Sequence, residues 1–154
     1  MAAQKKRNKK YVPRLAGDTI KLKMQPWEVR AVFGPLEAIL DQLEQQGTID
    51  VAGNQPVFRD HNDGCWYDTP AALLGVVEAY EIHEVRTGRP LALAPLRQLA
   101  HKLQYGVSIF SSDTEACRAC LVRMKAETIE MTAAYARDLI EDFQIKEALQ
   151  EAAA

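Results

Sequence analysis

The sequence predicts a predominantly α-helical α+β fold, with helices packed with a small antiparallel β-meander and a long C-terminal helix. Three observations favour this class. Apolar residues repeat at helical spacing over four stretches, the period drops to about two between residues 48 and 68, and no glycine or proline follows Asp113. At 154 residues, with 47% apolar and 26% charged residues, the chain has the length and composition of one globular domain.

The charges divide the chain into a basic arm and an acidic body. Residues 1–23 hold eight Lys and Arg against one acid, a net charge of +7, whereas the remainder holds 11 basic and 20 acidic residues, a net charge of −9. We therefore expect residues 1–25 to form a flexible arm and residues 26–154 to form a single helical domain. Within the arm, the alternation over residues 19–24 predicts a short strand or an extended segment on the body.

The composition of the arm suits the phosphate backbone of nucleic acid, because each neutralised phosphate releases counterions. A tyrosine in the arm can also stack on an exposed base. The arm has no motif for base readout, so binding is expected to be largely independent of sequence. An acidic protein partner and a solubilising tail are the alternatives. The residues expected to bind nucleic acid are Lys5, Lys6, Arg7, Lys9, Lys10, Tyr11 and Arg14.

The opening KKRNKKYVPR, residues 5–14, resembles the start of small uncharacterised proteins from bacteria and from their phages or prophages. The resemblance consists mostly of charge and carries over no functional residue. It implies a bacterial or phage accessory protein.

The first helix is predicted in two parts. Its apolar residues recur with spacings of three and four, but Gly34–Pro35 interrupts them, because proline within a helix clashes with the carbonyl four residues earlier. We expect a short turn over residues 26–33, a kink or break, and a helix over residues 35–46 that ends at Gly47. Trp27 is expected to pack as an anchor for the arm.

Three short strands are predicted next, over residues 48–52, 56–61 and 65–68, joined by turn sequences. Turn chemistry explains the polar residues that gather at the second turn. The alternative is a metal or acid–base cluster of His61 with Asp60 and Cys65, although no recognised ligand spacing is present. The polar residues concerned are Asp60, His61, Asn62, Asp63, Cys65 and Asp68.

The clearest helix covers residues 69–87, with Thr69 as N-cap and Gly88 as the C-terminal stop. Its last turns carry Glu81 and Glu84 on the apolar side, so these turns are expected to leave the core and face solvent. The alternative is an acidic, metal-binding site with His83 as a ligand. The residues of the apolar arc are Leu73, Leu74, Val76, Val77 and Tyr80.

A shorter helix is predicted from Pro95 to the stop at Gly106, with His101 facing solvent. The apolar link over residues 107–110 is expected to tuck under the core.

The last helix begins with a capping box over residues 112–115, and nothing interrupts it after that. A helix of about 40 residues would be roughly 60 Å long, too long for a domain of this size. We therefore expect it to bend or break, near Asp142, or to project and pair with a second copy of the chain.

Three cysteines favour a reducing compartment, and the cytoplasm is the expected location. Cys117 and Cys120 form a C-x-x-C. A zinc site would need a second ligand pair, and a thioredoxin-like site would need a βαβ unit, and neither is visible. We expect both side chains to pack in the core.

The sequence contains no phosphate-binding glycine loop, no nucleophile elbow and no metalloprotease motif, so we expect a protein that is not an enzyme and has no cofactor or bound metal. A helix followed by a hairpin is typical of winged-helix units. Glu37, Asp41 and Glu44 make the face of that helix acidic, which argues against reading DNA in the major groove.

Three functions remain. The first is an accessory or regulatory protein, encoded by a phage or prophage, whose arm contacts nucleic acid or a nucleoprotein assembly while the body engages protein. The second is a protein-interaction module or an inhibitor of host machinery that acts through its acidic body. The third is an enzyme with a dispersed or metal-dependent site. No membrane association is expected.

Overall fold

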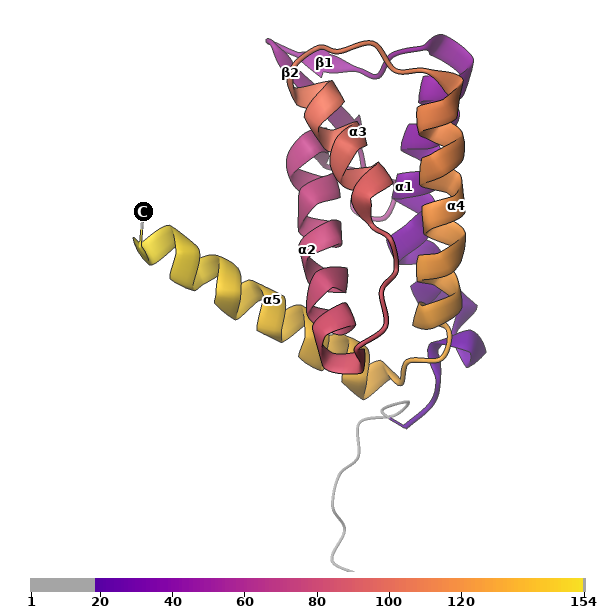
Figure 1. Ribbon diagram of the computed structural model, residues 1–154, viewed down its shortest axis with the longest axis vertical. Helices are drawn as coiled ribbons and strands as arrows, with labels where there is room; N and C mark the ends of the chain where they lie inside the picture. The colour runs from indigo at the N-terminus through magenta and orange to yellow at the C-terminus, as the bar shows by residue number, and fades with distance from the viewer. Residues whose placement is uncertain (1–18, 154) are drawn as a thin grey trace, which may run out of the picture.

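The computed structural model describes residues 19–153. A 3₁₀ turn, η1 (Leu22–Met24), leads into a bundle in which α1 packs on α4, α4 on α3, and α3 on α2 (Figure 1). A further helix, α5, leaves the lower end of the bundle at a steep angle and contacts α2. The helices are α1 (Pro26–Gln46), α2 (Thr69–Thr87), α3 (Ala94–Gln104), α4 (Ser111–Thr128) and α5 (Ala133–Ala153). Among the described residues, no helix combines the length and the apolar character that crossing a membrane requires.

A three-stranded antiparallel sheet lies against α2 and α3, and it confirms the predicted meander. Its strands, in spatial order, are β1 (Val51–Ala52), β2 (Gln55–Arg59) and β3 (Trp66–Asp68). Phe58 pairs with Tyr67 across β2 and β3, and their rings lie 5.9 Å apart. Each strand is shorter than predicted, and β1 begins only at Val51, since Ile49 is buried in the core before it.

The core forms where the apolar faces of the four bundle helices meet. The predicted faces are confirmed: Phe33, Leu40, Leu73 and Val77 are each at most 2% exposed. Tyr80 is also buried, its ring lies 6.5 Å from that of Phe33, and burial raises its pKa to about 12.

The predicted break in the first helix is wrong. α1 is continuous from Pro26 to Gln46, with Pro35 inside it. Pro35 has no N–H to donate to the carbonyl of Ala31, one turn earlier. The side-chain amide of Asn62, in the turn between β2 and β3, donates to that carbonyl at 2.9 Å. A side chain 31 positions away therefore replaces the lost helical hydrogen bond.

The predicted bounds of α2, residues 69–87, are confirmed, but its N-cap lies one residue earlier than predicted. Asp68 is the N-cap, and its carboxylate accepts from the N–H of Ala71 at 2.9 Å. Thr69 is the first helical residue and is fully buried. The C-terminal stop at Gly88 is confirmed, with a left-handed φ of 68°.

The last turns of α2 leave the core only in part: Val85 is 84% exposed, whereas the two glutamates there are half-buried. Glu81 forms an ion pair with Arg97 of α3. Glu84 accepts from the backbone N–H of Leu91 at 2.9 Å. Each carboxylate thus has a partner in the segment that follows α2.

The long C-terminal helix breaks after Thr128, earlier than the expected position near Asp142. No residue in the break is a helix breaker. The free N–H and C=O groups there bond instead to the segment before α1, which forms a β-bridge between Lys21 and Thr132. The hydroxyl of Thr132 then accepts from the N–H of Tyr135 and caps α5.

The entry to α4 also differs from the prediction. The helix starts at Ser111, and Asp113 reaches back to the N–H of Phe110 at 2.8 Å, so the capping interaction is shifted by two residues. The link before it does not tuck under the core. Val107 is 51% exposed and Phe110 is 61% exposed, and the ring of Phe110 lies 5.4 Å from the ammonium of Lys102.

We predict that Asn62→Ala lowers the free energy of unfolding by about 1 kcal/mol, because it leaves the Ala31 carbonyl without its partner. In a Pro35→Ala background the helix regains its own N–H donor, so the same substitution should cost clearly less. Chemical denaturation of the four proteins of this double-mutant cycle measures the difference. Asn54→Ala, in the neighbouring turn, is the matched control, and equal losses in both backgrounds would contradict the account.

Candidate functional site

The segment where the arm joins the body, residues 20–25, is named the arm root here. It bonds through its backbone to the loop between α4 and α5. The predicted strand or extended segment over residues 19–24 is confirmed only at Lys21, which forms a β-bridge with Thr132, whereas Leu22–Met24 form the 3₁₀ turn η1. The bonds run from Leu22 N to Met131 O at 2.8 Å, from Lys23 N to Ile129 O at 3.0 Å and from Ala133 N to Ile20 O at 3.1 Å.

Two lysines of the arm root share one carboxylate. The ammonium of Lys21 lies 2.6 Å from Glu130, and that of Lys23 lies 3.8 Å from it. The hydrogen bond from Lys21 lowers the pKa of Glu130, so this carboxylate is ionised at neutral pH. All three side chains are about half exposed. The trio keeps a net charge of +1, and its position continues the charge of the arm into the body.

The residues predicted to bind nucleic acid, Lys5 to Arg14, lie outside the described residues. The structure brings their point of attachment to the lower end of the bundle, beside η1 and the start of α5 (Figure 1).

A polar junction next to the arm root joins α2, α4 and α5. His83 is only 4% exposed, and both of its ring nitrogens are occupied: Nδ1 lies 2.7 Å from the hydroxyl of Tyr135, and Nε2 lies 3.0 Å from Glu127. Arg89 also binds Glu127, at 3.0 Å. Arg86 lies over the ring of Tyr135 at 5.4 Å. These groups line an open pocket of about 350 Å³.

The junction can hold α5 on the bundle, and its hydrogen bonds allow two protonation states of the histidine. A neutral ring donates from Nε2 to Glu127 and accepts the Tyr135 hydroxyl at Nδ1, whereas a protonated ring donates from both nitrogens. Neither state leaves a ring nitrogen for a ligand. The alternative of an acidic, metal-binding site with His83 as a ligand is therefore replaced by a hydrogen-bonded junction, and within residues 19–153 no group of three His, Cys, Asp or Glu side chains can hold a metal ion.

Sequence reasoning missed this junction because its members come from three helices. His83, Glu127 and Tyr135 are separated by 44 and 8 positions, and only the break between α4 and α5 turns Tyr135 toward His83. The sequence did show a histidine at the edge of the apolar arc of α2. The position of this histidine on the helix does not indicate which side chain it would contact.

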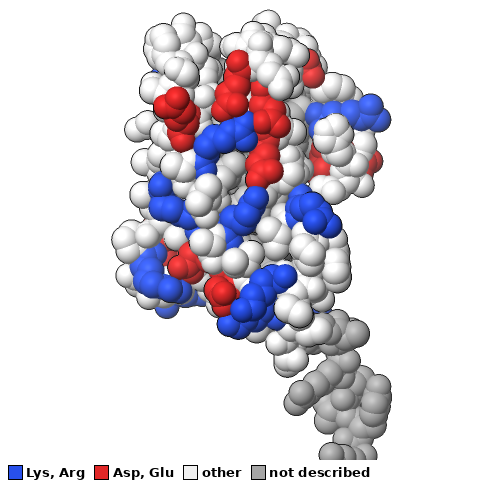
Figure 2. Space-filling view, turned by 90° about the vertical axis from the view of Figure 1, so that its right-hand side faces the viewer, with Lys and Arg blue, Asp and Glu red and all other residues white. Residues whose placement is uncertain are grey.

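The acidic row on α1, formed by Glu37, Asp41 and Glu44, is paired with two cations of α4. Arg118 binds Glu44 at 3.0 Å and also pairs with Asp41, and Lys125 binds Glu37 at 2.6 Å. The hydrogen bond from Arg118 lowers the pKa of Glu44. Figure 2 shows the result: red and blue side chains are interleaved on the face formed by α1 and α4, with Lys and Arg gathering toward its lower end.

The polar turn between β2 and β3 follows turn chemistry, as predicted. Asp60 accepts from the N–H of Asn62, and Asp63 accepts from that of Cys65, both at 2.8 Å. Asp63 also binds the hydroxyl of Tyr67, which raises the pKa of this tyrosine to about 12.

The C-x-x-C packs in the core, as predicted. Cys117 and Cys120 are fully buried, and their thiols donate to the carbonyls of Pro95 and Ala92. Burial raises the pKa of Cys117 to about 12 and also raises that of Cys120. Cys65 is exposed.

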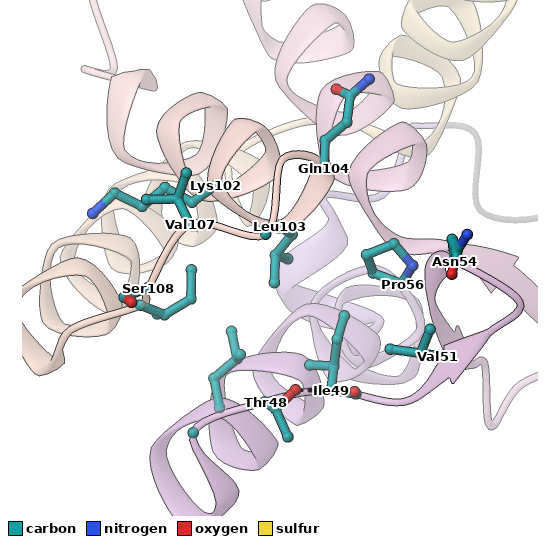
Figure 3. Close-up of a pocket in the computed structure, with 14 residues that line it drawn as sticks. Thr48, Ile49, Val51, Asn54, Pro56, Lys102, Leu103, Gln104, Val107 and Ser108 are labelled. Atoms are coloured by element: carbon teal, nitrogen blue, oxygen red, sulfur yellow. Dashed lines mark hydrogen bonds between the residues drawn. The ribbon is translucent and has the colours of Figure 1, made fainter.

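A second open pocket, of about 360 Å³, lies at the upper end of the molecule between the β1 region and the loop from α3 to α4 (Figure 3). Leu43, Ile49 and Leu103 form its apolar part. Its only ionisable lining residue, Lys102, is bound to Asp113 at 2.8 Å. The pocket thus offers apolar surface and no acid–base pair.

Comparison of the chain with protein-family models, with curated proteins and with solved structures finds no match.

We predict that Tyr135→Phe lowers the free energy of unfolding by about 1–2 kcal/mol, because a buried ring nitrogen of His83 loses its partner. His83→Ala should cost about 2–4 kcal/mol, since it also opens a cavity. Urea denaturation measures both values. His101→Ala, at an exposed position of α3, is the control and should stay within about 0.5 kcal/mol of the parent protein. If His83→Ala costs no more than His101→Ala, the stabilising role of the His83 junction is refuted.

We predict that one of the three thiols, Cys65, reacts with a disulfide reagent in the native protein. The thiolate is the reactive form, and burial with the raised pKa values keeps Cys117 and Cys120 protonated and slow to react. Spectrophotometric titration in buffer and in denaturant counts the reactive thiols. Cys65→Ser should abolish the native reaction, and rapid native labelling of that variant would show that the C-x-x-C is accessible.

Proposed function

We propose that this protein is an accessory factor that binds the phosphate backbone of nucleic acid through its basic arm, while its body contacts a protein in the same assembly. The resemblance of residues 5–14 to small bacterial and phage proteins favours a phage or prophage origin and a place in the bacterial cytosol or the infected host. The helices of the body pair many of their charges with one another, and the arm carries the surplus of positive charge.

The observation that carries this proposal is the pairing of each carboxylate of the acidic row on α1 with a cation of α4. An arm with six Lys and Arg before Asp18 would otherwise find its nearest polyanion on its own body. Glu37, Asp41 and Glu44 are already bound to Arg118 and Lys125, and Glu130 is already bound to Lys21. These carboxylates therefore attract the arm weakly, which supports an external polyanion as its partner.

The same observation weighs against the rival function, an inhibitor whose acidic body imitates nucleic acid. Such a surface needs rows of unpaired carboxylates, and Arg118 and Lys125 interrupt the acidic row on α1. An enzyme with a dispersed site is also less well supported, because His83 has both ring nitrogens bound within the protein.

We predict that the full chain binds duplex DNA with an affinity that falls steeply with salt. If all six basic residues of the arm contact phosphates, the affinity should drop roughly a thousandfold between about 50 and 200 mM salt. Fluorescence anisotropy with a labelled duplex measures the slope. Removal of residues 1–14 should abolish the binding.

The matched controls are two groups of charge substitutions. Replacing Lys5 and Lys6 with Gln should lower the salt slope by about two phosphate contacts. Replacing Arg30 and Lys146, which are exposed on the body, should leave the slope unchanged. Salt-independent binding, or binding that survives the truncation, would contradict the proposal.

A further inference from the structure

The exposed tryptophan beside the arm root points to the kind of nucleic acid that the arm would bind. Trp27 follows Pro26 at the start of α1 and is 56% exposed, although the sequence predicts a packing anchor there. Met24 is 66% exposed and Ile20 is 42% exposed, so the apolar surface continues around the indole. Such a cluster on the surface is typical of a binding site.

These side chains surround an open hollow with cationic groups at its edge. Its volume is about 670 Å³, and its surface is mostly apolar. The residues that line it are Ile20, Lys21, Lys23, Met24, Gln25 and Trp27. An aromatic side chain between lysines is the arrangement with which proteins hold single strands: the cations track the phosphates, and the ring stacks on a base.

The ion pairs of the arm root do not close this hollow. Lys21 and Lys23 share Glu130, and all three side chains are about half exposed. Exposed ion pairs contribute little net stability and are screened by salt. A phosphate can therefore replace the carboxylate of Glu130 at one of the two ammonium groups without loss of a buried contact.

The position of the hollow along the chain indicates which ligand it would bind. The six basic residues of the arm precede Asp18, and the described chain starts at Thr19, next to Ile20 in the wall of the hollow. If the arm binds the backbone of a nucleic-acid strand, the neighbouring nucleotides of that strand lie close to Trp27. A duplex keeps its bases stacked inside and offers the indole no free face, whereas a single strand does.

We propose that Trp27 and the hollow around it bind an unpaired base, so that the protein prefers single-stranded to double-stranded nucleic acid. This inference rests on the proposed function, because the arm supplies the backbone contacts. Trp27 adds discrimination between strand states, and it reads no sequence, since every base has a face on which it can stack.

The test compares two tryptophans of equal exposure. Trp27→Ala should weaken binding of an oligothymidylate about 5- to 150-fold, the range expected for loss of one stacked base, and leave duplex binding unchanged. Trp66→Ala is the matched control, since Trp66 is also 56% exposed but lies on β3, and it should change neither affinity. Trp27→Phe should retain most of the preference for single strands.

A second readout follows Trp27 directly. Trp66→Phe leaves Trp27 as the only tryptophan, and oligothymidylate should quench its fluorescence, whereas inorganic polyphosphate, which has no bases, should bind without quenching. Equal affinity of Trp27→Ala and the parent protein for oligothymidylate overturns the inference and leaves the proposed function intact. A change of Trp27 fluorescence on removal of residues 1–14, with no response to oligothymidylate, overturns it in favour of the arm itself as occupant. Absence of binding to every polyanion refutes the proposed function first.

Discussion

The crossing of two chain segments at the lower end of the bundle is the constraint on which the rest of this structure depends. The arm root bonds through its backbone to the residues between α4 and α5, and those bonds satisfy the peptide groups that a helix break leaves free. The break turns α5 away from α4 and toward α2. The same bonds fix the point from which the arm leaves the body. The backbone hydrogen bonds between the arm root and residues 129–133 therefore set both the direction of α5 and the location of the proposed binding surface.

The break has a second consequence in the packing of α2. Because α5 starts beside the end of α2, the hydroxyl of Tyr135 reaches His83, and Arg86 reaches Asp138 and Asp142 on α5. His83 can then stay buried with both ring nitrogens bonded, as a buried polar group must. These polar side chains thus link α2 to α4 and α5. The junction lies beside the arm root in space, because the loop residues Met131 and Thr132 contact both.

The charges of the body follow the same rule of local pairing. Helices α1 and α4 pack with carboxylates of one facing cations of the other, and the Arg118 and Lys125 pairs are partly exposed. Such pairs contribute modestly to stability. Their larger effect is to reduce the net charge of the acidic row from −3 to −1, which weakens the field that this row would otherwise produce.

The sequence by itself determined the periodic features of this protein: the helices, the meander, the burial of the C-x-x-C and the contrast between a basic arm and an acidic body. These follow from local spacing and composition, which act over a few residues. Only the tertiary structure decided where α1 continues through Pro35, where the last helix breaks and which residue His83 meets. Each of these depends on a hydrogen bond between residues more than 30 positions apart. Local propensity cannot specify such a partner, because an unpaired backbone or ring atom can form a hydrogen bond with any suitable donor or acceptor that the fold places beside it.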